Sequence, residues 1–254
     1  MYIDSHCHLD FPDLQGDLTG VLARMRESRV THALCVSVNL QDFPRVHSLA
    51  LAHEHLYASV GVHPDQPADD TTSTVRLVEL AALPKVIAIG ETGLDYFRLD
   101  GPAPWQQERF RRHIRAARET GKPLIVHTRS AAEDTLRIMR EEGAGEVGGV
   151  MHCFTETLEV ALAAIDLGFY ISFSGIVTFK NAVELKTVAQ QVPLARLLIE
   201  TDSPYLAPVP HRGRTNEPSY VALVAAEIAR LRALPVEAVA DASTRNFQQL
   251  FKVN

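Results

Sequence analysis

The chain has few cysteines and no apolar run long enough to cross a membrane. Its 254 residues include only Cys7, Cys35 and Cys153, which are widely spaced and form no Cys-x-x-Cys pair. This usage is typical of a reducing compartment and argues against a disulfide framework, so we expect three small buried residues. No apolar stretch reaches the ~18 residues of a transmembrane helix, and no secretory leader pattern opens the chain. We therefore predict a cytoplasmic protein that does not contact a membrane.

An excess of positive charge is also missing. The 25 Lys and Arg residues are outnumbered by 31 Asp and Glu, which gives a net charge of -6. A protein that holds duplex DNA by electrostatics usually has a basic face and a high pI. This composition argues against a non-catalytic DNA-binding module. If the substrate is a nucleic acid, bound metal ions and a few local basic residues must attract it.

Glycine-rich phosphate loops, internal repeats and long linkers are absent as well. No Gly-x-Gly-x-x-Gly follows the first strand, and no Gly-Lys-Ser/Thr loop occurs. What is present is an alternation of short apolar runs with amphipathic segments. The predicted strands are residues 3–8, 32–37, 56–60, 86–90, 124–127, 149–152, 169–174 and 197–200. The predicted helices are 16–28, 43–53, 75–83, 104–120, 131–142, 157–167, 181–190, 218–233 and 235–251.

This alternation predicts a parallel sheet, because a crossover helix is what returns the chain to start a parallel neighbour. Eight such units in about 250 residues favour an α/β fold of the (β/α)8 TIM-barrel type over an open doubly wound sheet. We expect one domain over residues 1–254.

Candidate metal ligands follow the predicted strands, at the barrel end where catalytic groups gather. Steps of two residues along a strand would place Asp4, His6 and His8 on one face. Later strand ends supply four more candidates, namely Glu91, His127, His152 and Asp202. Four imidazoles and two carboxylates are too many for one tetrahedral zinc, but they suit two divalent ions that share a carboxylate.

The ligand types suit zinc, magnesium or manganese, and Glu91 on a central strand is the natural bridge between two ions. We interpret Asp4 as a support for the ligands, since it lies one step deeper in the barrel. Glu200 is interpreted as a group that orients a ligand or its loop.

Six segments of the sequence resemble the signature blocks of the TatD family of metal-dependent deoxyribonucleases. They run in the family's order along the chain, as residues 3–10 (IDSHCHLD), 89–96 (IGETGLDY), 127–131 (HTRSA), 152–154 (HCF), 200–208 (ETDSPYLAP) and 212–218 (RGRTNEP). The second block departs from the usual family pattern at Thr92. The residue that follows the end of this block, Phe97, also departs from the pattern. Neither position is a candidate ligand.

The resemblance implies a TIM-barrel hydrolase of the amidohydrolase type with two divalent metal ions. His6, His8 and Asp202 would hold one ion, His127 and His152 the other, and Glu91 would bridge them. The implied substrate is DNA, in single-stranded form or at a frayed end. We expect stepwise removal of nucleotides by phosphodiester hydrolysis, with Asp202 accepting the proton of the attacking water.

Four further residues are candidates for substrate contacts. Arg129 follows His127 closely enough to steady a phosphate, although an ion pair at a helix start is an equal alternative. His63 either lines the pocket or is a structural turn histidine. Arg212 and Arg214 either contact the nucleic-acid backbone or are solvated loop residues. The sequence leaves His211 undecided, and the remaining histidines are interpreted as structural, namely His32, His47, His53, His55 and His113.

A second enzymatic function stays open, because an activated water attacks carbonyl carbon as readily as phosphorus. The alternative is a metal-dependent amide or ester hydrolase acting on a small molecule or an aminoacyl-RNA. Ligand spacing does not separate the two, and the sequence implies no obligatory protein partner.

Overall fold

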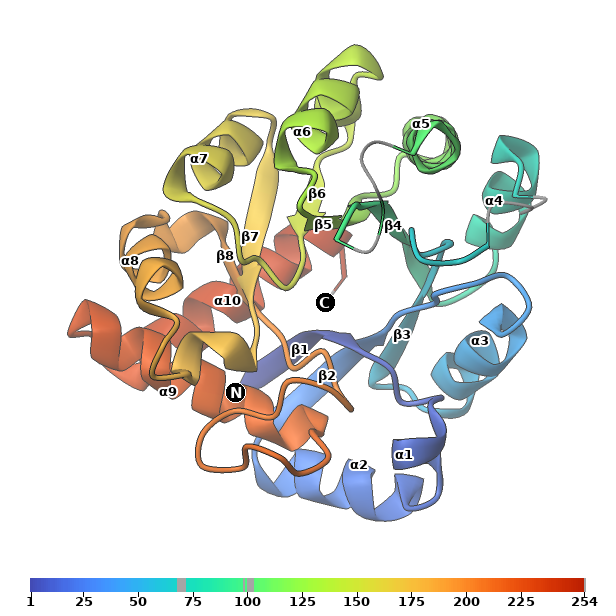
Figure 1. Ribbon diagram of the computed structural model, residues 1–254. Coiled ribbons are helices and arrows are strands. Elements are labelled where there is room, and N and C mark those ends of the chain that lie inside the picture. Colours follow the sequence, from blue (N-terminus) through green and yellow to red (C-terminus); the bar gives the residue numbers. More distant parts are fainter. Residues whose placement is uncertain (68–71, 98, 100–102, 254) are drawn as a thin grey trace.

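A computed structural model describes residues 1–67, 72–97, 99 and 103–253 of the chain. Eight parallel strands follow one another around a barrel in sequence order (Figure 1). This is the (β/α)8 TIM barrel that the alternation of strands and helices predicts. The strands are β1 Tyr2–Cys7, β2 Val30–Cys35, β3 Leu56–Val60, β4 Val86–Asp95, β5 Leu124–Arg129, β6 Gly149–Met151, β7 Phe169–Phe173 and β8 Leu197–Ile199.

Helices surround the barrel and return the chain to the start of each strand (Figure 1). They are α1 Pro12–Gln15, α2 Leu18–Glu27, α3 Phe43–Ala52, α4 Thr74–Ala81, α5 Pro104–Thr120, α6 Ala132–Glu141, α7 Leu158–Asp166, α8 Val183–Gln191, α9 Val221–Arg232 and α10 Val236–Phe251. Short 3-10 turns occur at Ala144–Glu146, Gly175–Thr178, Leu194–Arg196 and Pro218–Tyr220. Within the described residues, no helix combines the length and apolar character needed to cross a membrane.

Two helix predictions need adjustment. The predicted helix 16–28 is confirmed as α2, which begins at Leu18, and an additional helical turn, α1, begins at Pro12 ahead of the predicted stretch. The stretch 218–233 begins as a 3-10 turn and becomes α-helical at Val221. In both cases a proline, at position 12 or 218, opens a short turn, as its fixed φ favours.

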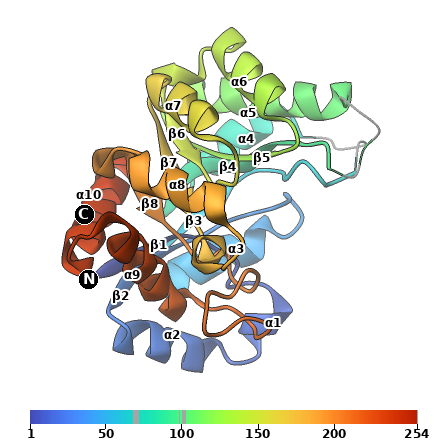
Figure 2. The same cartoon turned by 60° about the vertical axis from the view of Figure 1, so that its left-hand side comes forward.

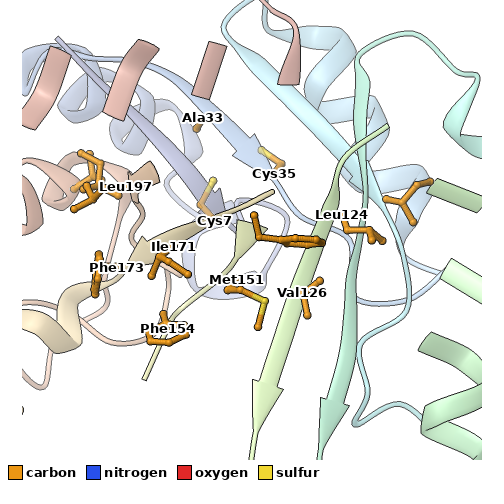
Figure 3. Packing of buried hydrophobic residues seen from close by; sticks show 14 of the residues in the cluster. Cys7, Ala33, Cys35, Leu124, Val126, Met151, Phe154, Ile171, Phe173 and Leu197 are labelled. Carbon is orange, nitrogen blue, oxygen red and sulfur yellow. The ribbon is translucent and has the colours of Figure 1, made fainter. Parts of the chain in front are cut away.

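Alternation along the strands divides the apolar residues into two layers. Leu124 and Val126 of β5 belong to the large layer between strands and helices, seen from close by in Figure 3. Ile125 between them belongs to a smaller cluster with Phe247 and Phe251 of α10. This helix therefore packs on the barrel end where strands begin, and Figure 2 shows it beside the N-terminus. The opposite end is left for polar side chains.

The barrel closes where β1 meets the segment after β8. The Asp202 N–H donates to the His6 carbonyl at 2.9 Å, and the His8 N–H donates to the Ser203 carbonyl at 2.8 Å. One level deeper, the buried Asp4 carboxylate accepts hydrogen bonds from the Thr201 N–H and hydroxyl. These contacts join residues about 200 positions apart in the chain. They support the interpretation of Asp4 as a supporting residue.

The prediction that Asp4 shares a face with His6 was wrong. Asp4 pairs with Ala33, and Cys7 pairs with Cys35. The chain therefore advances by three residues along β1 where it advances by two along β2. Both β2 partners belong to the layer under the helices. The extra residue of this register shift breaks the alternation, as a β-bulge does. His6 is thereby aimed into the barrel while Asp4 reaches sideways to β8.

β4 is longer than predicted, since it runs on to Asp95 in register with β5. Gly93 pairs with His127 and Asp95 with Arg129. Gly93 has a φ of +135°, and a Cβ there would collide with the His127 carbonyl oxygen. Only glycine permits this close approach of the two strands. Glu91 consequently lies inside a strand and not at its end.

Removal of the Asp4 carboxylate should destabilise the fold. In Asp4→Ala the buried Thr201 N–H and hydroxyl lose their acceptor, so we expect the free energy of unfolding to fall by about 2–4 kcal/mol. Asp4→Asn keeps a polar side chain of the same size and should lose less. Urea unfolding of both variants measures the difference, and equal stability of the two would contradict this role of the carboxylate.

Candidate metal centre

The Glu91 carboxylate lies at the centre of a buried cluster of imidazoles. Its Oε1 is 3.3 Å from His63 Nε2, 3.2 Å from His127 Nδ1 and 2.7 Å from His152 Nε2. The Glu91 side chain is only 3 % exposed. Three nitrogens therefore converge on one oxygen that is withdrawn from water.

Each of these three imidazoles has its other ring nitrogen against a second carboxylate. The nitrogen–oxygen distances are 2.6 Å from His63 to Asp65, 3.2 Å from His127 to Asp95 and 3.2 Å from His152 to Glu200. Because an ionised carboxylate can only accept, the outer nitrogen of each ring carries the proton and donates it. The inner nitrogen then faces Glu91, and it directs a lone pair toward Glu91 whenever it is not protonated. Metal-binding histidines are held in this way in many proteins.

The second Glu91 oxygen faces the histidines of the barrel seam. His6 Nε2 is 3.3 Å from Glu91 Oε2 and 3.2 Å from His8 Nε2. His8 donates from Nδ1 to the Val36 carbonyl at 3.0 Å, which leaves its Nε2 a lone pair. That Nε2 lies 3.4 Å from Asp202 Oδ1. Glu91 thus separates two groups of possible ligands.

The cluster fits divalent cations. Among the described residues, His152 Nε2 is buried without a hydrogen-bond partner, although it faces the Glu91 oxygen. Facing lone pairs of nitrogen and oxygen repel unless a cation or a proton lies between them. In the part of the chain that the structure describes, three sets have ligand atoms within 4.8 Å of one another, namely His6–His152–Asp202, His6–His8–Glu91 and His63–Glu91–His127. Imidazole nitrogen with carboxylate oxygen suits zinc and manganese, and carboxylate oxygen suits magnesium.

The electrostatics of the cluster keep its carboxylates ionised. Burial works against the charge of Glu91, but the surrounding histidines hold its pKa well below the usual range. Burial is likewise outweighed at Asp202, where the hydrogen bond to His8 lowers the pKa. Burial also opposes protonation of His63, yet Glu91 and Asp65 raise its pKa to about 10. The site therefore combines negative carboxylates with rings that attract protons or metal ions.

The cluster forms the floor of a cavity of about 750 Å³ at the barrel end where the strands finish. Phe11, Arg129 and Tyr205 are among the residues that line it. Cys153 also lines it and is partly exposed, so the expectation of a buried residue was wrong there and right for Cys7 and Cys35. A cavity of this volume lies within the range of small-ligand pockets.

Polar residues of α5 hold the loops that carry His63 and Asp95. Gln106 donates to the Pro64 carbonyl at 2.9 Å and accepts from the Asp95 N–H at 3.0 Å. Arg109 donates to the His63 carbonyl at 3.1 Å, and His113 accepts from the Val62 N–H at 3.0 Å. All three α5 side chains are buried. These bonds explain why polar residues occur on the buried side of α5 together with Phe110 and Ile114.

The structure brings all six predicted metal ligands into this one cluster and adds His63 to it. Arg129 lies at the cavity wall, as its position after His127 suggested. Arg212 and Arg214 are exposed, and neither is among the described residues that line the cavity. The Arg212 guanidinium lies 3.6 Å from the centre of the Phe179 ring. His113 has the structural role that we expected, because it accepts a hydrogen bond from the Val62 N–H.

Sequence reasoning missed Asp65, Asp95 and the α5 residues. Asp65 follows His63 by two positions, which was a usable local signal. Asp95 was not recognised because β4 was expected to end at Gly90. The spacing of Gln106, Arg109 and His113 places polar residues on one helix face, and this could have marked α5 as a support.

Comparisons with known proteins agree with this geometry. The sequence profile of the family described as TatD related DNase matches residues 3–252. The metal-dependent hydrolase YcfH of Escherichia coli K12 is 48 % identical over 255 residues, with 99 % of this chain and 96 % of YcfH covered. YabD of Bacillus subtilis, also a metal-dependent hydrolase by name, is 42 % identical and is covered over the full length of both chains. The crystal structure of the E. coli TatD homologue YjjV superimposes with a TM-score of 0.92 at 30 % identity, covering 100 % of this chain and 98 % of YjjV.

Fold, site and relatives together define a metal-dependent hydrolase built on a (β/α)8 barrel. Within that class, the chain belongs to the TatD family.

Divalent metal should stabilise the protein through Glu91. At a hundredfold excess of Mn²⁺ or Zn²⁺ over its dissociation constant, we expect the Tm to rise by about 5–10 °C over the chelated protein. Glu91→Gln should lose most of this metal-dependent rise, because it removes the charge at the centre of the cluster.

The matched control for this melting experiment is His47→Ala, which changes a histidine bonded to the Pro84 carbonyl far from the cluster. Its metal-dependent rise should equal that of the unchanged protein. An undiminished rise in Glu91→Gln would show that the metal binds elsewhere.

Proposed function

We propose that this protein hydrolyses phosphodiester bonds in DNA with two divalent metal ions, as an exonuclease that removes nucleotides from a strand end. The observation that supports this most directly is the position of Glu91, whose two oxygens face separate groups of imidazoles. Two-metal sites of this kind clamp the attacking and leaving oxygens of a phosphoryl group. The name of the matching family supports DNA as the substrate.

In this proposal, His6, His8 and Asp202 hold one ion, His127 and His152 hold the other, and Glu91 lies between them. Zinc, magnesium and manganese are the candidate ions. When bound, divalent ions lower the pKa of water and offset negative charge on phosphate oxygens. Asp65, Asp95 and Glu200 keep the three rings on Glu91 Oε1 in the tautomer and orientation that this requires.

The chain's own contribution to bond cleavage is centred on Asp202. Its carboxylate is ionised and 15 % exposed, so it can accept the proton of a water at the cavity floor. The water oxygen forms a bond to phosphorus while the bond from phosphorus to a sugar oxygen breaks. The accepted proton then passes to that leaving oxygen. General base catalysis of this kind contributes about 10²–10⁴ in rate.

The proposal places substrate contacts both at the cavity and outside it. Arg129 and His63 lie at the cavity and would contact the phosphate under attack or its neighbour. Arg212 and Arg214 lie outside the cavity and would contact phosphates further along the strand. A cavity of small-ligand size at the end of a barrel suits a single strand or frayed end better than an intact duplex.

The test is digestion of single-stranded DNA labelled at either end. The metal-loaded protein should release labelled mononucleotides from one end, and Asp202→Asn should reduce kcat by about 10²–10⁴ while keeping its fold by circular dichroism. Full activity of the metal-loaded variant would contradict the role of Asp202. Hydrolysis of carboxylic esters or amides without nucleotide release would instead support the alternative hydrolase.

Variants of the arginines should separate near from distant phosphate contacts. Arg129→Ala should raise KM about tenfold on a dinucleotide and on a long oligonucleotide, because it removes a charged hydrogen bond at the cavity. The double variant Arg212→Ala/Arg214→Ala should leave the dinucleotide unaffected. On the long strand it should lower the slope of log(kcat/KM) against log salt by about 1.4, which is ~0.7 per lost contact. An unchanged slope would indicate that both arginines are solvated loop residues that do not contact the strand.

A further inference from the structure

Two aromatic side chains are more than half exposed: Tyr205 lines the cavity, and Phe97 packs against Arg129, which also lines it. The chain has ten Phe, six Tyr and one Trp, all within the described residues. Phe97 is 57 % exposed and Tyr205 is 55 % exposed, whereas every other aromatic side chain is buried or half-buried. Exposed large apolar groups that gather at a functional cavity mark a binding surface.

Tyr205 is tied to the backbone of the candidate metal centre. Its N–H donates to the Asp202 carbonyl at 3.0 Å, and its own carbonyl accepts from Asn216 at 2.6 Å. The Phe11 ring lies 6.2 Å from the Tyr205 ring in an edge-on arrangement and stacks on His8 at 4.7 Å. Aromatic surface therefore extends without interruption from the cluster to the outer edge of this wall.

Phe97 is tied to the centre from the opposite side. Its N–H donates to Asp95 Oδ1 at 2.9 Å, and Asp95 in turn holds His127. The Arg129 guanidinium lies 3.6 Å from the centre of the Phe97 ring. This wall follows β4 and β5, whereas Tyr205 follows β8. In a ring of eight strands, β4 and β8 face each other across the mouth.

We propose that these two walls, Phe11 with Tyr205 and Phe97 with Arg129, are stacking sites for two neighbouring nucleobases of a single strand. The inference rests on the proposed function, since it places the cleaved phosphate between the walls and above Glu91. Bases stack on aromatic rings and on guanidinium planes, and this recognition tolerates any sequence.

The arrangement favours bases over other apolar partners. A lipid or protein surface would require one continuous apolar patch, whereas these rings are separated by a cavity whose floor is charged. A nucleotide strand has the matching pattern, because its apolar bases alternate along the chain with anionic phosphates. Stacking also requires unpaired bases, so the walls select single strands and frayed ends.

The first measurement uses the metal-loaded protein and an oligonucleotide whose end carries 2-aminopurine and a non-hydrolysable phosphonate linkage. Stacking quenches 2-aminopurine fluorescence, so the unchanged protein should reduce the emission. Tyr205→Leu and Phe97→Leu should each weaken binding about 5- to 100-fold, because leucine keeps apolar area but removes the ring. Tyr205→Phe should retain both quenching and affinity.

The matched control is Leu162→Ala, which changes an exposed apolar residue on α7 away from the mouth. It should bind like the unchanged protein. Absence of quenching, or quenching and affinity that survive both leucine substitutions, would overturn the stacking walls. This readout needs no turnover, so it is distinguishable from failure of the proposed function, which would appear as no nucleotide release from labelled DNA.

A kinetic measurement adds a second readout. Replacing the two terminal bases by abasic sugars should lower kcat/KM of the unchanged protein about 5- to 100-fold. Tyr205→Leu should show a much smaller difference between the base-bearing and abasic substrates. A full preference for bases in Tyr205→Leu would contradict the inference.

Discussion

The pairing of the first strand with the segment after the last one is the constraint on which the site depends. Backbone hydrogen bonds between His6 and Asp202, and between His8 and Ser203, close the barrel at the level of the candidate ligands. The same contacts that finish the sheet therefore bring together residues from the two ends of the chain. The Asp4 side chain reinforces this seam from outside the cavity, where burial raises the pKa of its carboxyl group to about 8.

Closure places a buried carboxylate among five imidazoles, and charge balance explains the rest of the site. An ionised group as deep as Glu91 is costly unless nearby groups compensate it. Rings on both sides supply that compensation, and outer carboxylates fix the orientation of three of them. The cluster is consequently rigid at its floor and open toward the cavity. A metal-dependent hydrolase requires this combination, because ligands must be preorganised while the substrate still enters.

The loops above this floor are held by polar groups that normally avoid a core. Beside the buried apolar residues of α5, Gln106, Arg109 and His113 form hydrogen bonds to loop carbonyls and N–H groups. Buried polar residues are stabilising when every partner is satisfied. Hydrogen bonds also link Phe97 and Tyr205 to the candidate metal centre. The Phe97 N–H donates to the Asp95 side chain, and the Tyr205 N–H donates to the Asp202 carbonyl.

The sequence by itself determined the barrel and the order of its elements, because apolar runs and amphipathic segments are local patterns. It also indicated the six candidate ligands, since these follow predicted strands and match a family's blocks. Only the tertiary structure decided how they are grouped around Glu91, because a bulge in β1 and the extension of β4 to Asp95 depend on the neighbouring strands. The place of His63 beside Glu91 and the aromatic walls also required the folded chain. Those contacts join separate loops, and no spacing along one segment encodes them.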